Sequence, residues 1–288
     1  MPRSFARPGS FGRHPFADHD AVDVSSGPVI VLGYAYNGAG YLRRMLSSHE
    51  ALACVSGTGL LPLCEMAASA WQQIENRGGP PSSLAIASIR MMTDSLITTA
   101  LAGTGKTRWC EIAFAPPRYA EIFMQMYPAA KFVCLHRNCL DVVSSGIRAN
   151  PWGLADTPMK TFTGTYPGNL VAAVAAYWAA STEPLLEFEQ AHPGACHRLK
   201  YEDLVSRPDE TFSQMSSFLS LDVYGPGNRH LAGDDLIPTS GGNGLLQMEQ
   251  VPVGWIPRPL ITLVNQLMEQ LGYPPVPMPD SGVSAPIG

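Results

Sequence analysis

Hydrophobic positions in this chain follow two patterns, short continuous apolar runs and longer stretches with helical spacing. The runs at 28–33 (PVIVLG), 108–114 (RWCEIAF) and 131–136 (KFVCLH) are short and largely apolar, which is typical of strands buried in a sheet. A fourth run, CHRLKY at 196–201, is expected to be another strand of the same sheet. The chain therefore contains four predicted strands, separated by much longer segments.

In those longer segments, apolar residues recur at every third or fourth position, which is the spacing of a helix. The expected helices cover 40–48, 59–80, 84–102, 116–128, 140–148, 169–190, 209–221 and 256–273. The segment 149–168 is rich in Pro, Gly and Thr, and we expect a long loop there that acts as a lid or substrate wall. Alternating strands and helices predict an α/β fold with a central parallel sheet flanked by helices.

The length of 288 residues suits a single domain with one large core. We place that domain at 27–275. The stretches 1–26 and 276–288 are expected to be flexible tails, because neither contains an apolar periodic pattern.

Composition narrows the classes of partner. The net charge is −5 and no cluster of Lys and Arg offsets it, so we expect no nucleic-acid partner. No apolar run approaches the ~20 residues of a membrane span, and the N-terminus does not resemble a secretory signal. The six cysteines form no CxxC pair and show no metal-ligand spacing, which is typical of a cytoplasmic protein without a bound metal.

Two sites along the chain have the chemistry of phosphate binding. The first strand ends in Gly33 and is followed by a turn, YAYNGAG, and a helix start. That outline often holds a phosphate through backbone N–H groups, although this turn contains no Lys, Arg, Ser or Thr. The second site has Arg137 where a strand ends and Ser145 on the next helix, and a guanidinium with a hydroxyl suits a doubly charged phosphate.

Three segments, in this order, resemble the bacterial branch of the sulfotransferase family, whose members use 3′-phosphoadenosine 5′-phosphosulfate (PAPS). The segment 28–49 is similar to the family's 5′-phosphosulfate loop, and 127–146 (YPAAKFVCLHRNCLDVVSSG) is similar to its 3′-phosphate motif. The third segment, 197–221, resembles the Tyr-Glu-Asp-Leu region of the family. The resemblance implies a P-loop-type fold and transfer of a sulfuryl group from PAPS.

The resemblance also implies roles for particular residues. Arg137 and Ser145 would hold the 3′-phosphate of the nucleotide, and Tyr201 would lie near its adenine. The turn after the first strand would hold the 5′-phosphosulfate through Tyr36, Asn37, Gly38, Ala39 and Gly40.

The turn departs from the family pattern at its side chains. Tyr36 stands where the family has a Lys or Arg, and Asn37 stands at the Ser position. Ala39 and Gly40 replace two threonines. The backbone of the turn is therefore expected to remain, while Tyr36 offers only a neutral hydroxyl as a catalytic donor.

The family's catalytic Lys and His near the strand 108–114 are also missing. Glu111 falls near the Lys position and Ala113 near the His position. Bacterial relatives place an acid in the loop after the first helix, where this chain has Gly57 or Thr58. Glu111 and His49 are therefore the candidate catalytic bases.

The expected lid supplies Trp152, Phe162 and Tyr166 as candidate walls of an apolar acceptor pocket. Several candidate residues also have a purely structural interpretation. In that interpretation Arg137 pairs with Asp141 at the surface, Glu111 is a surface carboxylate, Tyr201 is a core residue, and His49 only ends a helix.

We expect sulfuryl transfer from PAPS to a hydroxyl of a small molecule, with secondary metabolites among the candidate acceptors. Because the turn lacks its cation, two alternatives stay open. The fold could catalyse acid–base chemistry without PAPS, such as a cyclisation or an elimination. It could also bind a nucleotide or metabolite without turnover. The oligomeric state is left open.

Overall fold

The structure is a computed structural model that describes residues 27–76, 78–222 and 251–278. The predicted tail at 1–26 and residues 279–288 lie outside the described residues. Val276, expected at the start of the second tail, is buried instead. Its backbone N–H and C=O both bond to the side chain of Asn265, at 2.6 and 3.0 Å. The packed domain therefore continues at least one residue beyond the predicted boundary at 275.

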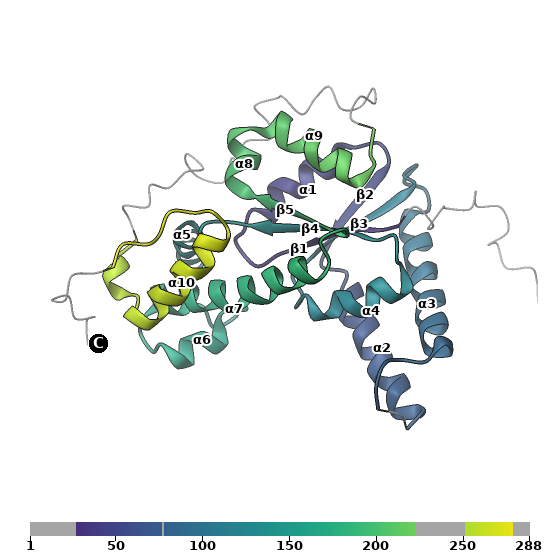
Figure 1. The fold of residues 1–288 in the computed structure, drawn as a ribbon, viewed down its shortest axis with the longest axis horizontal. Helices are drawn as coiled ribbons and strands as arrows, with labels where there is room; N and C mark the ends of the chain where they lie inside the picture. The colour runs from purple at the N-terminus through teal and green to yellow at the C-terminus, as the bar shows by residue number, and fades with distance from the viewer. Residues whose placement is uncertain (1–26, 77, 223–250, 279–288) are drawn as a thin grey trace, which may run out of the picture.

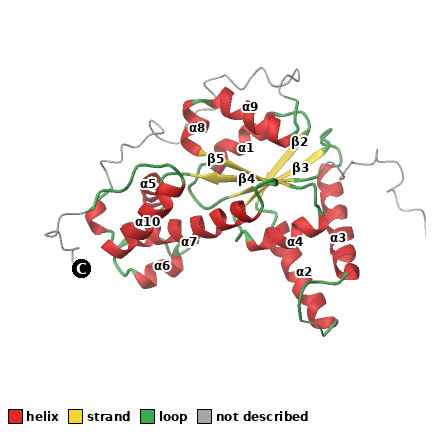
Figure 2. Ribbon diagram, in the orientation of Figure 1, coloured by secondary structure: helices red, strands yellow, loops and turns green. Residues whose placement is uncertain are grey.

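Within the described residues, five parallel strands form one sheet in the order β2-β3-β1-β4-β5. The strands are β1 (Val29–Leu32), β2 (Leu52–Ser56), β3 (Arg108–Ala113), β4 (Lys131–His136) and β5 (Cys196–Lys200). All four predicted strands are present. β2 was not predicted, because the residues between the first and second expected helices were interpreted as a loop. The sheet lies between two layers of helices (Figures 1 and 2).

The helices follow the predicted segments closely. They are α1 (Ala39–Ser48), α2 (Leu60–Ile74), α3 (Ser83–Leu101), α4 (Arg118–Met126), α5 (Cys139–Ala149), α6 (Lys160–Thr165), α7 (Leu170–Ala191), α8 (Tyr201–Ser206), α9 (Pro208–Leu219) and α10 (Arg258–Gln270). Two differ from expectation. The segment 149–168 contains the short helix α6, so it is not entirely a loop, and Tyr201 begins α8 instead of ending β5.

Alternate side chains of each strand serve two separate cores, as the two-residue period of a strand requires. In β1, Val29 and Val31 pack with α1, α8 and α9, whereas Ile30 and Leu32 pack with α2, α4 and α7. Figure 1 shows these helix groups on opposite faces of the sheet. All four residues are at most 1% exposed. The sheet is therefore covered on both faces, as a parallel sheet must be.

The helices that follow two neighbouring strands, β1 and β4, lie on opposite faces of the sheet. The chain leaves β1 through α1 on one face, and leaves the neighbouring β4 through α5 on the other face. In open α/β sheets, ligands bind outside the carboxyl ends of strands at such a switch point. The turn after β1 and Arg137 after β4 both lie there.

One helix in the described part of the chain, α3, has the length and mean hydropathy (1.2) that a membrane span requires. A single helix of this kind is weak evidence, because a helix of a soluble domain can pass the same test.

Candidate functional site

The turn after β1 is held in place by Asn37, which is 1% exposed. Its Nδ2 donates to the backbone O of Leu135 at 3.1 Å, and its Oδ1 accepts from the N–H of Ala39 at 3.0 Å. The side chain thus joins β1 to β4 and caps the first turn of α1. Asn37 was predicted to bind the cofactor, but its side chain is committed to shaping the turn, so only its backbone can take that role.

Gly38 lies against the ring of Tyr201. Its φ is +92°, and a Cβ built there would lie 2.0 Å from Cδ2 of Tyr201. Only glycine satisfies both the backbone angle and this contact. Among the described residues, the backbone N–H groups of Gly38 and Gly40 have no acceptor. The turn therefore retains the donors that suit an anion at a helix start.

Tyr36 also has a positive φ, +66°, which is uncommon for a residue with a Cβ. Its backbone O accepts from Nη1 of Arg137 at 2.9 Å. Its hydroxyl accepts from Nδ2 of Asn150, at the end of α5, at 2.6 Å. The Tyr36 hydroxyl is thus oriented toward α5, and its own proton stays available to a ligand.

Arg137 lies at the centre of the site. Its guanidinium carbon is 4.4 Å from the ring centroid of Tyr201, a cation–π contact. Within the described residues, no carboxylate lies in ion-pair distance of Arg137, and its buried Nε has no acceptor. The alternative in which Arg137 pairs with Asp141 is therefore not observed. Burial raises the pKa of Asp141, and the nearby charge of Arg137 opposes that rise.

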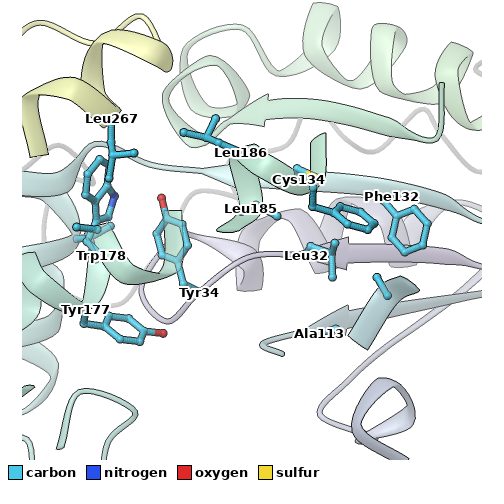
Figure 3. Close-up of a cluster of buried hydrophobic side chains, with 14 of the residues drawn as sticks. Leu32, Tyr34, Ala113, Phe132, Cys134, Tyr177, Trp178, Leu185, Leu186 and Leu267 are labelled. Atoms are coloured by element: carbon cyan, nitrogen blue, oxygen red, sulfur yellow. The ribbon is translucent and has the colours of Figure 1, made fainter. Parts of the chain in front are cut away.

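The backbone of Arg137 is fixed by residues that the sequence did not single out as positioning groups. The hydroxyl of Tyr34 accepts from the N–H of Arg137 at 3.1 Å and contacts its carbonyl O at 3.2 Å. Nε1 of Trp178 donates to the same carbonyl at 2.9 Å. Figure 3 shows Tyr34 and Trp178 together at one end of the apolar cluster. Glu202 holds the next residue, because its Oε1 accepts from the N–H of Asn138 at 2.9 Å.

Ser145 lies on α5, the helix that begins just after Arg137. Its side chain is half-buried, and no partner for its hydroxyl occurs among the described residues. The predicted nucleotide-binding residues therefore gather at one edge of the sheet, around the turn, Arg137 and Tyr201.

Glu111 is not a surface carboxylate, as its structural interpretation held, because it is only 1% exposed. Its Oε1 accepts a hydrogen bond from the Thr58 hydroxyl, and its Oε2 has no partner among the described residues. Burial raises the pKa of Glu111, and the Thr58 hydrogen bond partly opposes that rise.

His49 does not lie at the site. It follows α1 and precedes β2, so it belongs to the amino ends of the strands, opposite the turn. Its Nδ1 accepts from the N–H of Ala51 at 3.1 Å, and its Nε2 contacts the carbonyl O of Asp222 at 3.0 Å. Both ring nitrogens are engaged, so the prediction of His49 as a catalytic base does not fit the structure.

A pocket of about 440 Å³ opens beside the turn, at the carboxyl ends of β1 and β3. Its lining is mainly apolar and consists of Gly33, Tyr34, Phe114, Ala115, Pro116, Pro117, Arg118, Pro158, Tyr177, Ala180, Ser181, Pro184 and Leu185. The pocket lining contains no Asp, Glu or His.

The three predicted pocket residues do not line this pocket. Trp152 is 99% exposed and cannot act as a wall in this conformation. Phe162 makes an edge contact with Tyr177, with ring centroids 6.0 Å apart, and so packs against a residue that lines the pocket. Tyr166 is half-buried against the same core. The pocket instead takes its walls from α7 and the start of α4, which a search for lid aromatics overlooks.

Groups of three or more His, Cys, Asp or Glu side chains able to hold a metal ion do not occur in the part of the chain that is described.

Comparison with known proteins agrees with this arrangement. The sulfotransferase domain from the curacin biosynthetic pathway has a TM-score of 0.58 at 19% identity, over 86% of this chain and 98% of that chain. The sulfotransferase domain of the Synechococcus PCC 7002 olefin synthase has a TM-score of 0.54 at 18% identity, over 87% and 96%. Sulfotransferase STF9 from Mycobacterium avium has a TM-score of 0.56 at 10% identity, over 86% and 77%.

At identities this low, the structural likeness shows a shared fold. No protein in the search of curated sequences matches the chain. The model of the sulfotransferase family matches residues 28–225, which is well over half of the sequence. The chain therefore belongs to the sulfotransferase family.

Proposed function

We propose that this protein transfers a sulfuryl group from PAPS to a hydroxyl of a small molecule. The observation that carries the proposal is Arg137, a partly buried cation with no carboxylate partner among the described residues. Its orphaned Nε and its contact with Tyr201 fit a guanidinium that is held ready for an anion. The unpaired N–H groups of Gly38 and Gly40 lie on the adjacent turn.

In this proposal different residues bind the two ends of the nucleotide. Arg137 and Ser145 hold the 3′-phosphate, and Tyr201 supports the guanidinium from its ring face. The backbone of residues 36–40 holds the 5′ end, where PAPS supplies the sulfuryl group. The hydroxyl proton of Tyr36 is the one side-chain donor that the turn itself offers, because the Asn37 side chain is used internally.

The pocket next to the turn is the proposed acceptor site. Its walls are mostly Pro, Phe, Leu and Tyr, and Ser181 and Arg118 add polar groups. Such a site takes a molecule with an apolar body and few charges. The acceptor hydroxyl would approach the turn from the side of Gly33 and Tyr34.

One observation favours a second candidate function, chemistry without PAPS. The turn has lost the family's cation, and a lost transition-state donor typically lowers a rate by ~10²–10³. A buried acid, Glu111, remains next to the site and suits acid–base catalysis of a cyclisation or elimination. A protein that only binds a nucleotide would keep Arg137, but it would need neither a cation in the turn nor the acid Glu111.

Sulfur-35-labelled PAPS tests the proposal directly. Wild type and Arg137→Ala are incubated with a panel of apolar alcohols and phenols, and labelled product is separated by chromatography. We expect label to reach at least one acceptor with wild type, and a much lower rate with Arg137→Ala at limiting PAPS. Conversion of an acceptor at the same rate without PAPS would favour the second candidate. PAPS binding with no product across the panel would favour the binder.

A further inference from the structure

A buried acid and an exposed hydroxyl meet at β3, one of the two strands at whose ends the proposed acceptor pocket opens. Glu111 lies in β3, directly across from Ile30 of β1 and Val55 of β2. Its side chain points to the face of the sheet that carries α2, α4 and α7, between Trp109 and Ala113. The pocket lies on that same face, at the end of β3.

Thr58 gives this buried acid access to solvent. It lies in the turn between β2 and α2, and it is exposed. Its hydroxyl donates to Oε1 of Glu111, and its Oγ1 accepts from the N–H of Leu60 at 3.3 Å. A hydroxyl oxygen has two lone pairs, so one remains for a third group. Thr58 is thus able to accept a proton from outside while it passes its own to Glu111.

The position of Thr58 suits an acceptor held at the pocket. The N–H of Gly57 contacts the carbonyl O of Ile112 at 3.4 Å, so this turn begins at the carboxyl end of β3. Neighbouring strands lie about 4.8 Å apart, which places the end of β2 roughly 10 Å from the end of β1. The pocket opens at the ends of β1 and β3, and Thr58 follows β2, the next strand beyond β3. An acceptor that extends from the pocket across the end of β3 would therefore approach Thr58.

We propose that Thr58 and Glu111 form a proton relay that activates the acceptor hydroxyl, with Thr58 touching the acceptor and Glu111 receiving the proton. The inference rests on the proposed function for its acceptor. The two residues come from adjacent strands of the sheet, because Glu111 lies in β3 and Thr58 follows β2.

The acceptor O–H gives its proton to Oγ1 of Thr58, and the Thr58 hydroxyl gives its proton to Oε1 of Glu111. The acceptor oxygen forms a bond to sulfur as the bond between sulfur and the phosphate oxygen of PAPS breaks. Glu111 ends the step as a neutral acid and returns its proton to solvent through Thr58.

The surroundings of Glu111 support this role. Burial raises its pKa, which makes the carboxylate a stronger base nearer to neutral pH. The titratable groups that Glu111 influences electrostatically are the thiols of Cys64, on α2 at the same face of the sheet, and of Cys110, its neighbour in β3, which points to the opposite face. Burial raises the pKa of Cys64 to about 11 and also raises that of Cys110, so both thiols are neutral at pH 7. They therefore do not compete with Glu111 as charged groups.

Two acceptors of different acidity separate a relay from a structural role. An alcohol such as 1-octanol needs a base, whereas 4-nitrophenol ionises unaided near neutral pH. We expect Glu111→Gln and Thr58→Val to lower the PAPS-dependent kcat/KM for 1-octanol by ~10²–10⁴ and that for 4-nitrophenol far less. Thr58→Ser keeps the hydroxyl and should keep the octanol rate within about tenfold. Equal losses for both acceptors, or unchanged rates, would overturn the relay while sulfuryl transfer still stood.

A titration of the Glu111 carboxyl needs no PAPS. It therefore tests the relay even if wild type transfers no sulfuryl group to 1-octanol or 4-nitrophenol. Protein labelled with ¹³C at the Glu carboxyl is titrated by NMR, and the Glu111 signal is assigned by its absence in Glu111→Gln. We expect a pKa above the ordinary Glu value in wild type, and a higher one in Thr58→Val, because the Thr58 donor lowers it. An ordinary pKa, or one that Thr58→Val leaves unchanged, would overturn the relay. Absence of transfer with a raised, Thr58-dependent pKa would instead remove PAPS from the proposed function.

Discussion

Gly38 determines how closely the turn can approach Tyr201, and its substitution has a clear expected cost. In Gly38→Ala the new methyl group meets the Tyr201 ring and the residue must hold a positive φ. Strain and overpacking together should lower the free energy of unfolding by about 3 kcal/mol. Urea unfolding of the purified variant measures this.

Gly40→Ala is the matched control, two residues away in the same turn. A Cβ at Gly40 meets nothing within 4 Å, and the residue lies inside α1. We expect between no change and about 1 kcal/mol of added stability. Equal effects of the two substitutions would mean that the turn does not pack against Tyr201 as described.

The raised pKa of Glu111 predicts a pH dependence of stability with a definite sign. A carboxyl whose folded pKa lies above its ordinary value, 4.5, stabilises the fold while it is protonated. That contribution is complete below the ordinary pKa and is lost as the pH rises through the folded pKa. Each unit between the two pKa values corresponds to about 1.4 kcal/mol.

Wild type should therefore lose stability relative to Glu111→Gln as the pH rises from about 4 to 8. Melting temperatures of both proteins across this range measure the difference. A difference that stays constant with pH, or that grows in favour of wild type, would show that Glu111 is not buried as a raised-pKa acid.

At the level of single residues, the sequence was informative where a motif fixes a backbone position. Arg137 follows the last residue of a buried strand, so its place at the carboxyl edge of the sheet could be predicted. The surroundings of Glu111 and His49 could not, because both depend on residues distant in the sequence. Glu111 bonds to Thr58, 53 positions away, and His49 contacts Asp222, 173 positions away.

At the scale of elements, the C-terminal end of α1 is capped by Lys106, which is distant in the sequence. Nζ of Lys106 donates to the carbonyl O of Ser47 at 2.8 Å and to that of His49 at 2.7 Å. These are among the carbonyls that a helix leaves without partners at its end. Lys106 comes from the turn between α3 and β3, and so links the two segments.

Lys106→Met should lower the free energy of unfolding by about 1–2 kcal/mol, because charged hydrogen bonds to these carbonyls are lost. Lys160→Met, at an exposed lysine at the start of α6, should change it by less than about 0.5 kcal/mol. Chemical denaturation of both variants makes the comparison. The account of the α1 cap fails if Lys106→Met unfolds at the same denaturant concentration as the control.

The predicted elements agree with the structure where the pattern is long or fully apolar, as in α7 and β1. β2 escaped prediction because its five residues, LACVS, lie at the sheet edge and run into a glycine-rich turn. α6 has only six residues (KTFTGT), none of them buried, so it carries no apolar period to detect. Such short, exposed elements are determined by tertiary contacts more than by their own sequence.

At the scale of the whole molecule, the sheet order places two kinds of surface side by side. The turn after β1 and Arg137 after β4 form a polar edge at the switch point, and the apolar pocket opens beside it toward β3 and α7. Figure 3 shows Tyr34, Tyr177 and Trp178 near one another in the buried cluster. In the proposed function, a charged donor at the polar edge and an apolar acceptor in the pocket would approach one another from neighbouring strands.

The central claim is that Arg137 holds the 3′-phosphate of a nucleotide. Its most direct test is the melting temperature with and without 3′-phosphoadenosine 5′-phosphate, for wild type, Arg137→Ala and Arg148→Ala. Arg148 is an exposed arginine in the last turn of α5 and serves as the charge-matched control. Adenosine 5′-phosphate, which lacks the 3′-phosphate, serves as the control ligand.

Ligand at 100 times its dissociation constant adds about 2.7 kcal/mol of stability, or roughly 5 °C for a chain of this size. We predict that rise for wild type and Arg148→Ala, with little or none for Arg137→Ala or for adenosine 5′-phosphate. No rise in wild type, or an equal rise in Arg137→Ala, would contradict the account.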